Sequence, residues 1–397
     1  MKTGKWLVVL AALGALAGCK NFWQAPSNSG GGGGGSSASS GVFYVANQAT
    51  SQLASYSIVS GKLSALNGSP STLAVPPRAI AVAPSGSFLY VGTVGGGIFL
   101  FSIGSGGTVS IENSGTAVSP DLAFAMQVDA SGTWLVDAFV TLSGGVQVNA
   151  IPITASGAID QSRTEQSPVF NLSGATVNGL DIAPDGGHVF VAAGTAGTLV
   201  IPFASASSAP LSANSASTIR PLSAGGSALS VAVDPTNRLF YIGETLASAS
   251  GKSGGLRAFV YSSLSGSTVT QASGSPIDSG GLAPSAILPL STGDYVFVAN
   301  GQGTSNVGNI QGFAVTAGGS TAAPTYTVAS AGNSVATGNQ PVGLAEDNQG
   351  NYVLVVDSGG NPDLEAFTIG SGGALTSALS SATGNDPVQA SAIAALP

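Results

Sequence analysis

The chain has 397 residues, of which 7% are charged, 43% are hydrophobic and 58 are glycines. This composition excludes a disordered protein, which would be poor in hydrophobic residues and rich in charge. Two of the ten Lys and Arg residues, Lys2 and Lys5, precede Cys19, which leaves eight basic against 18 acidic side chains beyond it. This acidic balance argues against nucleic acid and anionic lipid headgroups as partners.

The N-terminus has the features of an export signal. Lys2 and Lys5 are followed by an apolar run over residues 6–16 and by Leu-Ala-Gly-Cys at 16–19. The run is about half of the ~20 apolar residues that a membrane span needs. The last four residues resemble the lipobox of bacterial lipoproteins, which implies a signal peptide at 1–18 and a lipid on the Cys19 thiol. An ordinary secretory signal with a chance cysteine is the alternative.

Cys19 is the only cysteine of the chain. Once acylated, it leaves no thiol for a disulfide, a metal or nucleophilic catalysis. Residues 19–40 are rich in glycine and serine and are typical of a flexible tether. Lys20 after the acylated cysteine resembles outer-membrane sorting, so we expect a cell-envelope protein whose only membrane contact is its N-terminal lipid.

From Gly41 onward the chain repeats itself. The clearest unit starts at Pro77 and contains an apolar strand, a Pro-Ser-Gly turn, a second apolar strand, a glycine-rich turn and two further strands. Six such units are complete, and internal repeats of 40–50 residues with several short strands are typical of propellers. The first strands are small and apolar, whereas the second strands are continuous apolar runs that suit burial between two sheets.

The two ends of the chain supply a seventh unit. The segment from Gly41 lacks a leading strand, and the segment from Pro387 is a leading strand with nothing after it. The sequence therefore predicts an all-β, seven-bladed β-propeller over residues 41–397, closed by pairing of the N- and C-terminal strands in one blade. A single β-sandwich is the competing fold, but it does not explain seven similar units.

The turns and strand ends carry a family resemblance. The motifs PSGSFLYVG and PDGGHVFVA, with units that end in FSIGSGGTVS or FTIGSGGALTS, resemble the propeller lactonases of the 6-phosphogluconolactonase-like family. The resemblance covers residues 41–397 and implies the fold more strongly than the activity, because these motifs form turns and core strands. It implies lactone hydrolysis by polar and charged residues at the mouth of the channel.

Aligning the repeats on their turns indicates which residues ring that mouth, because equivalent positions lie at equal depth around one axis. One ring is expected at the entry to the first strands, and the other just beyond the second strands. The first contains Arg78, Asp121, Asn178, Leu229, Ser285, Val342 and Val388. The second contains Asn47, Thr93, Ala138, Ala193, Glu244, Asn300 and Asp357.

From these rings we predict Arg78, Glu244 and Asp121 as catalytic residues of a lactonase. Arg78 and Asp121 belong to adjacent blades and could form an ion pair. A ligand site at the same mouth is expected to use Asn47, Asn178, Asn300 and Asp357, with Glu244, Asn300 and Asp357 converging on the ligand. Local hydrogen bonds in turns are the alternative role for each Asp and Asn.

Other chemistry has little support in the sequence. The one histidine, His188, falls at the start of a second strand and is interpreted as a packing residue. One histidine and one lipidated cysteine cannot form a zinc site, and no Asp-x-Asp-x-Asp-Gly loop is present for calcium, so we expect no metal and no cofactor.

The scarcity of histidines and cations favours a binding module over an enzyme. Its partner would be a lactone, a glycan or another envelope protein, and the domain is expected to be a monomer. The alternative is an extracytoplasmic lactone hydrolase that opens a sugar lactone ring.

Overall fold

The computed structural model describes residues 39–397 except 60, 248–252, 267, 302–306, 321–322, 361 and 381–386. The expected signal peptide, Cys19 and residues 19–38 of the tether lie outside the described residues. The described chain consists of β-strands joined by turns and six single-turn 3-10 helices. None of its helices is long and apolar enough to cross a membrane.

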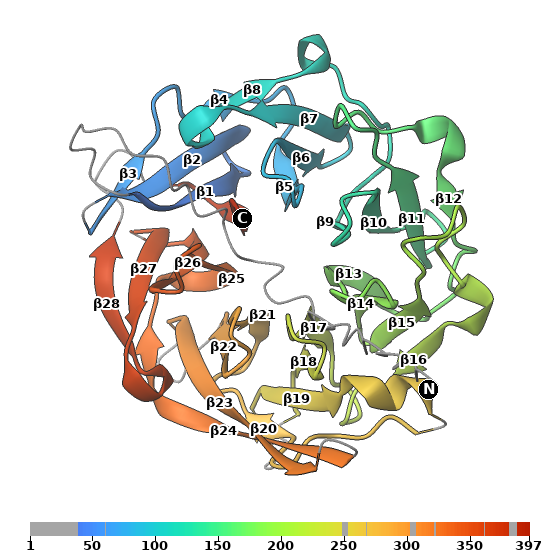
Figure 1. The fold of residues 1–397 in the computed structure, drawn as a ribbon, viewed down its shortest axis with the longest axis vertical. Helices are drawn as coiled ribbons and strands as arrows, with labels where there is room; N and C mark the ends of the chain where they lie inside the picture. Colours follow the sequence, from blue (N-terminus) through green and yellow to red (C-terminus); the bar gives the residue numbers. More distant parts are fainter. Residues whose placement is uncertain are drawn as a thin grey trace, which may run out of the picture.

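The strands form sheets that stand around a central axis, as in a β-propeller (Figure 1). Within each four-strand sheet, consecutive strands pair antiparallel, with the first strand next to the axis and the last at the rim. Four sheets have four strands each: β5 (Pro77–Val82), β6 (Phe88–Thr93), β7 (Gly97–Ile103) and β8 (Val109–Ile111); β9 (Ala125–Val128), β10 (Trp134–Val140), β11 (Val146–Pro152) and β12 (Glu165–Gln166); β21 (Pro284–Pro289), β22 (Tyr295–Asn300), β23 (Asn309–Ser320) and β24 (Ala323–Ala336); β25 (Asn339–Glu346), β26 (Tyr352–Gly359), β27 (Leu364–Ile369) and β28 (Leu375–Ser380).

A longer sheet of eight strands is built from two successive four-strand meanders. They are joined by a single residue pair, Gly194 with Ala228. The strands are β13 (Ala175–Ile182), β14 (His188–Gly194), β15 (Thr198–Pro202), β16 (Ser217–Ile219), β17 (Ala228–Val233), β18 (Leu239–Glu244), β19 (Gly255–Val260) and β20 (Ile277–Asp278). The 3-10 helices are η1 (Ser105–Gly107), η2 (Asn113–Gly115), η3 (Gln161–Arg163), η4 (Ala213–Ser215), η5 (Tyr261–Ser265) and η6 (Ser371–Gly373).

The remaining sheet contains both ends of the described chain. Its order is β29–β1–β2–β3, with β29 at Ala390–Ala395, β1 at Ser39–Asn47, β2 at Gln52–Val59 and β3 at Lys62–Ala65, and β4 (Ser71–Thr72) also pairs with β2. Val45 of β1 pairs with Ile393 of β29. The expected pairing of the terminal strands is therefore present, and it removes the open edge that β1 would otherwise have.

The hydrophobic core lies between neighbouring sheets. On β6, Tyr90 packs with the β9–β12 sheet, whereas Leu89 and Val91 pack with the sheet that contains β1. All three side chains are fully buried. Both faces of a second strand are thus covered, which is why its sequence is a continuous apolar run and does not alternate.

The recurring Gly-Ser-Gly-Gly motif lets neighbouring sheets approach closely. Gly107 and Gly373 each end a 3-10 turn with φ of +83° and +75°, a conformation that favours glycine. A Cβ on Gly107 would lie 2.5 Å from Val42, and one on Gly373 would lie 2.4 Å from Tyr295, each on a neighbouring sheet. The glycines of this motif therefore allow neighbouring sheets to pack closely.

Most first strands begin with a β-bulge. The register against the second strand shifts by one residue at Arg78, Leu229, Ser285, Val342 and Ser391. In β13 the shift falls between Ala175 and Gly179, a stretch that includes Asn178. Bulges change the direction of side chains and increase the local twist. They therefore affect which side chains point into this end of the channel.

Candidate functional site

Arg78 lies where its position in the repeat predicts, but with a different partner. Its guanidinium carbon is 3.9 Å from the centre of the Phe124 ring, and burial lowers the pKa of Arg78. Phe124 directly precedes β9, so the register places Phe124, and not Asp121, at the level of Arg78. None of the three ion pairs of the described chain includes Arg78. The suggested Arg78–Asp121 ion pair is therefore absent, and a cation–π contact links these two sheets.

Other residues at this end of the channel hydrogen-bond to the next inner strand around the axis. Asn178 Nδ2 donates to the carbonyl oxygen of Ala228 at 2.9 Å, and Ser391 Oγ donates to that of Pro77 at 3.1 Å. Ser285 donates in the same way to the carbonyl oxygen of Pro341. Each acceptor belongs to the first residues of the next inner strand around the axis. These contacts join neighbouring inner strands, so Asn178 has a structural partner at the position where a ligand was expected.

Glu244, at the end of β18, is fully buried in an ion pair. Its Oε1 is 2.7 Å from Nη1 of Arg257 on β19, and its Oε2 accepts from the Leu222 amide at 2.9 Å. Burial raises the pKa of Glu244, and the Arg257 charge acts in the opposite direction. Both carboxylate oxygens are therefore used within the protein.

Asn47 and Asn300 occupy the same level and are also buried. Asn47 Oδ1 accepts from the Val388 amide at 2.7 Å. Asn300 Nδ2 donates to Asn309 Oδ1 at 2.8 Å, and Asn300 Oδ1 accepts from Ser279 Oγ at 2.7 Å. Both side-chain amides therefore have hydrogen-bond partners within the protein.

Asp357 is fully buried on β26 near Asp363 and Glu365. Burial first, and then these two carboxylates, raise the pKa of Asp357 to about 8. Glu244 and Asn300 therefore each have partners within the protein, and the convergence of Glu244, Asn300 and Asp357 on a ligand stays a prediction. The repeat alignment gave their level correctly but could not give their direction.

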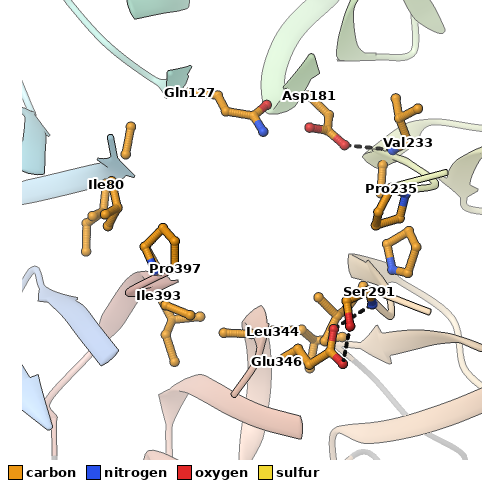
Figure 2. A pocket seen from close by; sticks show the side chains of 18 of the residues that line it. Ile80, Gln127, Asp181, Val233, Pro235, Ser291, Leu344, Glu346, Ile393 and Pro397 are labelled. Atoms are coloured by element: carbon orange, nitrogen blue, oxygen red, sulfur yellow. Dashed lines mark hydrogen bonds between the residues drawn. The ribbon is translucent and has the colours of Figure 1, made fainter. Parts of the chain in front are cut away.

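A cavity of about 430 Å³ opens at the other end of the channel, where the first strands end (Figure 2). Its volume falls within the range of small-molecule sites. The polar residues that line it come from different sheets: Gln127 on β9, Asp181 on β13, Ser291 after β21, and Glu346 on β25 followed by Asp347 and Asn348. Figure 2 shows Asp181 and Glu346 on different sides of this cavity.

Asp181 is held by backbone donors from two strands. Its Oδ2 accepts from the Val233 amide at 2.7 Å, and its Oδ1 accepts from its neighbour Ile182 at 2.9 Å. Gln127 Oε1 also accepts from the Ile182 amide, at 2.8 Å. Burial raises the pKa of Asp181 to about 6, although these hydrogen bonds favour the charged form.

Glu346 is fixed by the turn after β21. Its Oε2 accepts from the Ser291 amide at 2.7 Å, and its Oε1 accepts from the Ser291 hydroxyl at 3.1 Å. Burial is the main cause that raises the pKa of Glu346. Asp181 and Glu346, two of the three acidic residues that line the cavity, are thus held in place by backbone and hydroxyl donors; the third is Asp347.

Deeper in the cavity, one residue before the level of Gln127 and Asp181 on the inner strands, the wall is apolar. One residue from each inner strand lies at the same register level, and all of these residues are aliphatic or methionine: Ile80, Met126, Leu180, Val231, Ile287, Leu344 and Ile393. We call this set the apolar ring. Among the described residues that line the cavity there is no Lys, Arg or His. The cavity can therefore bind hydroxyl or ammonium donors and is unsuited to a phosphate.

The sequence interpretation missed this cavity, because the first strands were treated as uniformly small and apolar. The signal was present in three repeats. Gln127, Asp181 and Glu346 are polar residues within strands whose counterparts in other repeats are Ala, Val, Leu or Pro. A polar side chain in such a strand needs either a local partner or a ligand.

His188 lies in a packing environment outside the channel cavity. Its Nδ1 is 3.1 Å from the Tyr261 hydroxyl, which donates to Asp185 Oδ1 at 2.7 Å. The His188 and Tyr261 rings meet edge to face with centres 5.6 Å apart. Burial is the larger influence and lowers the pKa of His188. These contacts agree with the interpretation of His188 as a packing residue.

Comparison with known proteins shows the fold. No protein-family model matches the chain, and no curated protein matches it. A proposed 6-phosphogluconolactonase from Bacteroides uniformis has a TM-score of 0.66 at 15% identity, over 90% of this chain and 99% of the other. The periplasmic gluconolactonase PpgL of Pseudomonas aeruginosa has a TM-score of 0.64 at 17% identity, over 91% and 99%. A protein from Lactobacillus plantarum has a TM-score of 0.60 at 17% identity, over 91% and 100%. The chain thus has the β-propeller fold of proteins named as lactonases.

Proposed function

We propose that this protein is an exported, lipid-anchored propeller that binds a small molecule in its channel cavity. We count seven blades, because the eight-stranded sheet consists of two meanders that share only the Gly194–Ala228 pair. The leader and Cys19 support anchoring to the cell envelope, with the outer membrane as the destination and a monomer as the working form. Nucleic acid is not a partner in this proposal, since the chain is acidic.

The cavity of about 430 Å³ carries the binding proposal. Asp181 and Glu346 offer acceptors on different sides, and the apolar ring offers a hydrophobic wall. The ligand class that fits is a small molecule with hydroxyl or ammonium donors, an apolar face and no phosphate. A neutral sugar or an amino sugar meets these requirements.

Calorimetry with the purified protein tests binding. Glucose, glucosamine and glucose 6-phosphate serve as first probes of neutral, cationic and anionic ligands. We expect the phosphorylated sugar to bind worst, and we expect Asp181→Asn and Glu346→Gln each to weaken binding of the preferred probe by about tenfold, the loss of one hydrogen bond to a charged group. Asp160→Asn, at an exposed turn, is the matched control. Preference for the phosphorylated sugar would count against the proposal.

Lactone hydrolysis is the second candidate function. The observation in its favour is Asp181, whose pKa of about 6 suits a general base or acid near neutral pH. Two of the similar structures are also named as lactonases. A lactonase based on Arg78, Asp121 and Glu244 would first require Glu244 to leave Arg257.

A panel of phosphorylated and unphosphorylated sugar lactones separates the two candidates. Turnover above the uncatalysed rate that Asp181→Asn abolishes would identify a lactonase working in the cavity. Turnover abolished by Arg78→Ala or Asp121→Asn would place the reaction at the other end of the channel. Binding without turnover would favour the binding module.

A further inference from the structure

A buried polar cluster lies on the β9–β12 sheet, apart from the channel cavity. Asp137 on β10 pairs in register with Asn149 on β11, and both side chains are fully buried. Asn149 Nδ2 donates to Asp137 Oδ1 at 3.2 Å. This bond uses one oxygen of Asp137 and the amide nitrogen of Asn149.

The two remaining oxygens have no partner. Asp137 Oδ2 and Asn149 Oδ1 are buried and accept no hydrogen bond from the described residues. Buried acceptors almost always have a donor or a cation, because losing water without replacement costs on the order of 1–3 kcal/mol, and more for a charged group. When Asp137 is ionised, both atoms are acceptors, so neither can satisfy the other.

A second carboxylate adds negative charge to this cluster. Asp121 lies in the segment that leads into β9, the strand whose Met126 pairs with Asp137, and it is close enough to Asp137 for the two negative charges to repel each other. Asp121 Oδ2 accepts from the Ser119 hydroxyl at 2.7 Å. None of the three ion pairs of the described chain includes Asp121 or Asp137. No described Lys or Arg therefore forms an ion pair with this cluster.

We propose that a divalent cation of the calcium type binds between Asp137, Asn149 and Asp121. All three side chains offer oxygen atoms, the ligands that calcium prefers, whereas zinc prefers nitrogen and sulfur ligands. Two carboxylates balance a charge of +2. Backbone carbonyls and water complete such sites, and calcium tolerates irregular geometry.

The site differs from a cluster made of carboxylates alone. Among the described residues there is no group of three or more His, Cys, Asp or Glu that could hold a metal ion. Here an amide replaces the third carboxylate, which is consistent with weak affinity, in the range of 10⁻⁴–10⁻³ M found for extracellular modules. A bound cation would tie the segment from Ser119 to Phe124 onto β10 and so hold Phe124 beneath Arg78.

Thermal unfolding of the full chain tests this site. The protein is treated with EDTA, dialysed, and melted with 10 mM CaCl₂ or with NaCl of equal ionic strength. We expect calcium to raise the Tm by about 3 °C relative to NaCl, as binding to the folded state requires. Titration calorimetry with CaCl₂ should give one site.

The variants compare the calcium-dependent shift within each protein. Asp137→Asn and Asp121→Asn should both abolish the shift, whereas Asp160→Asn, at an exposed turn, should retain it. Asp121 is only half-buried, so its variant keeps the test valid if Asp137→Asn fails to fold. Equal Tm values in CaCl₂ and NaCl, or a shift that persists in Asp121→Asn, would overturn the proposal and leave a proton or a water molecule as the occupant.

Discussion

Glu244 and Asp181 are both buried carboxylates, and their neighbours give them different chemistry. Glu244 has a cationic partner in Arg257, whereas Asp181 is held only by neutral donors and faces the cavity. A buried ion pair loses most when one partner alone is removed, because the other charge then stays buried without compensation. A lone carboxyl instead responds to pH.

Removing Arg257 should therefore destabilise the protein strongly. We expect Arg257→Leu to lower the free energy of unfolding by about 3–5 kcal/mol, as measured by urea denaturation. The double variant Glu244→Leu/Arg257→Leu should recover part of this loss. Arg163→Leu, which breaks an exposed pair with Asp160, is the control and should have no measurable effect. If Arg163→Leu lowered the free energy of unfolding as much as Arg257→Leu does, the expected role of burial would be contradicted.

Asp181 should make stability depend on pH. Its pKa in the folded protein is about 6, against about 4 in the unfolded chain. Between these values the folded state binds more protons, so stability falls as the pH rises from 4 to 7, by about 2 kcal/mol from this group. In Asp181→Asn this component should vanish. Unfolding free energies measured from pH 4.5 to 7.5 check it, and parallel curves for the two proteins would refute the assignment.

For single residues, the sequence predicts the level along the channel better than it predicts the hydrogen-bond partners. The repeats placed Asn47, Glu244, Asn300 and Asp357 at one level, as the strand pairing has them. Their direction depends on loops outside the repeat, such as the one that brings Leu222 to Glu244. Loop residues of this kind have no counterpart in other repeats, so alignment could not reveal them.

At the scale of single elements, the Gly-Ser-Gly-Gly turn offers a matched pair of substitutions. Gly106 and Gly107 both have positive φ, but a Cβ on Gly106 would meet nothing within 4 Å, whereas one on Gly107 would meet Val42. Gly106→Ala should cost about 1 kcal/mol of backbone strain. Gly107→Ala should cost at least about 2 kcal/mol more, since the sheets must separate. Thermal melts test this, and Val42→Ala should partly rescue Gly107→Ala but not Gly106→Ala.

The strands themselves were largely predictable from the sequence. Apolar runs and turn residues located the first and second strands of each repeat, and the missing leading strand at Gly41 located the pairing of β1 with β29. The bulges were not predictable, because one extra residue leaves the apolar pattern nearly unchanged. Asp121 was misplaced for another reason, since β9 starts only at Ala125 and its register puts Phe124 beside Arg78.

For the whole molecule, β29 determines whether the ring closes. Deleting residues 387–397 would expose the edge of β1 and remove Ile393 and Leu396 from the packing around it. We expect the truncated protein to lose its single cooperative thermal transition, as followed by circular dichroism. Deleting Pro397 alone is the control and should leave the transition in place. A truncated protein that melts like the full chain would show that β29 is dispensable.

The propeller fold could be predicted because it depends on a pattern repeated along the chain, so an error in one unit is corrected by the others. The cavity depends on exceptions to that pattern. Gln127, Asp181 and Glu346 each occur once, on β9, β13 and β25, and only closure of the ring brings them to one cavity. A pattern averaged over repeats suppresses such single polar residues.

Pairing of β29 with β1 also means that the ring is joined at that point by hydrogen bonds and packing alone. The covalent break could therefore be moved to another loop between sheets without changing any pairing. A circular permutant that links Pro397 to Ser39 through a short glycine-rich segment, and that opens between β8 and β9, should fold to the same ring. If the proposed lipid tether were joined to the new first strand, it would leave from a different side of the propeller, which would change how the domain is oriented on a bilayer while its cavity stays intact.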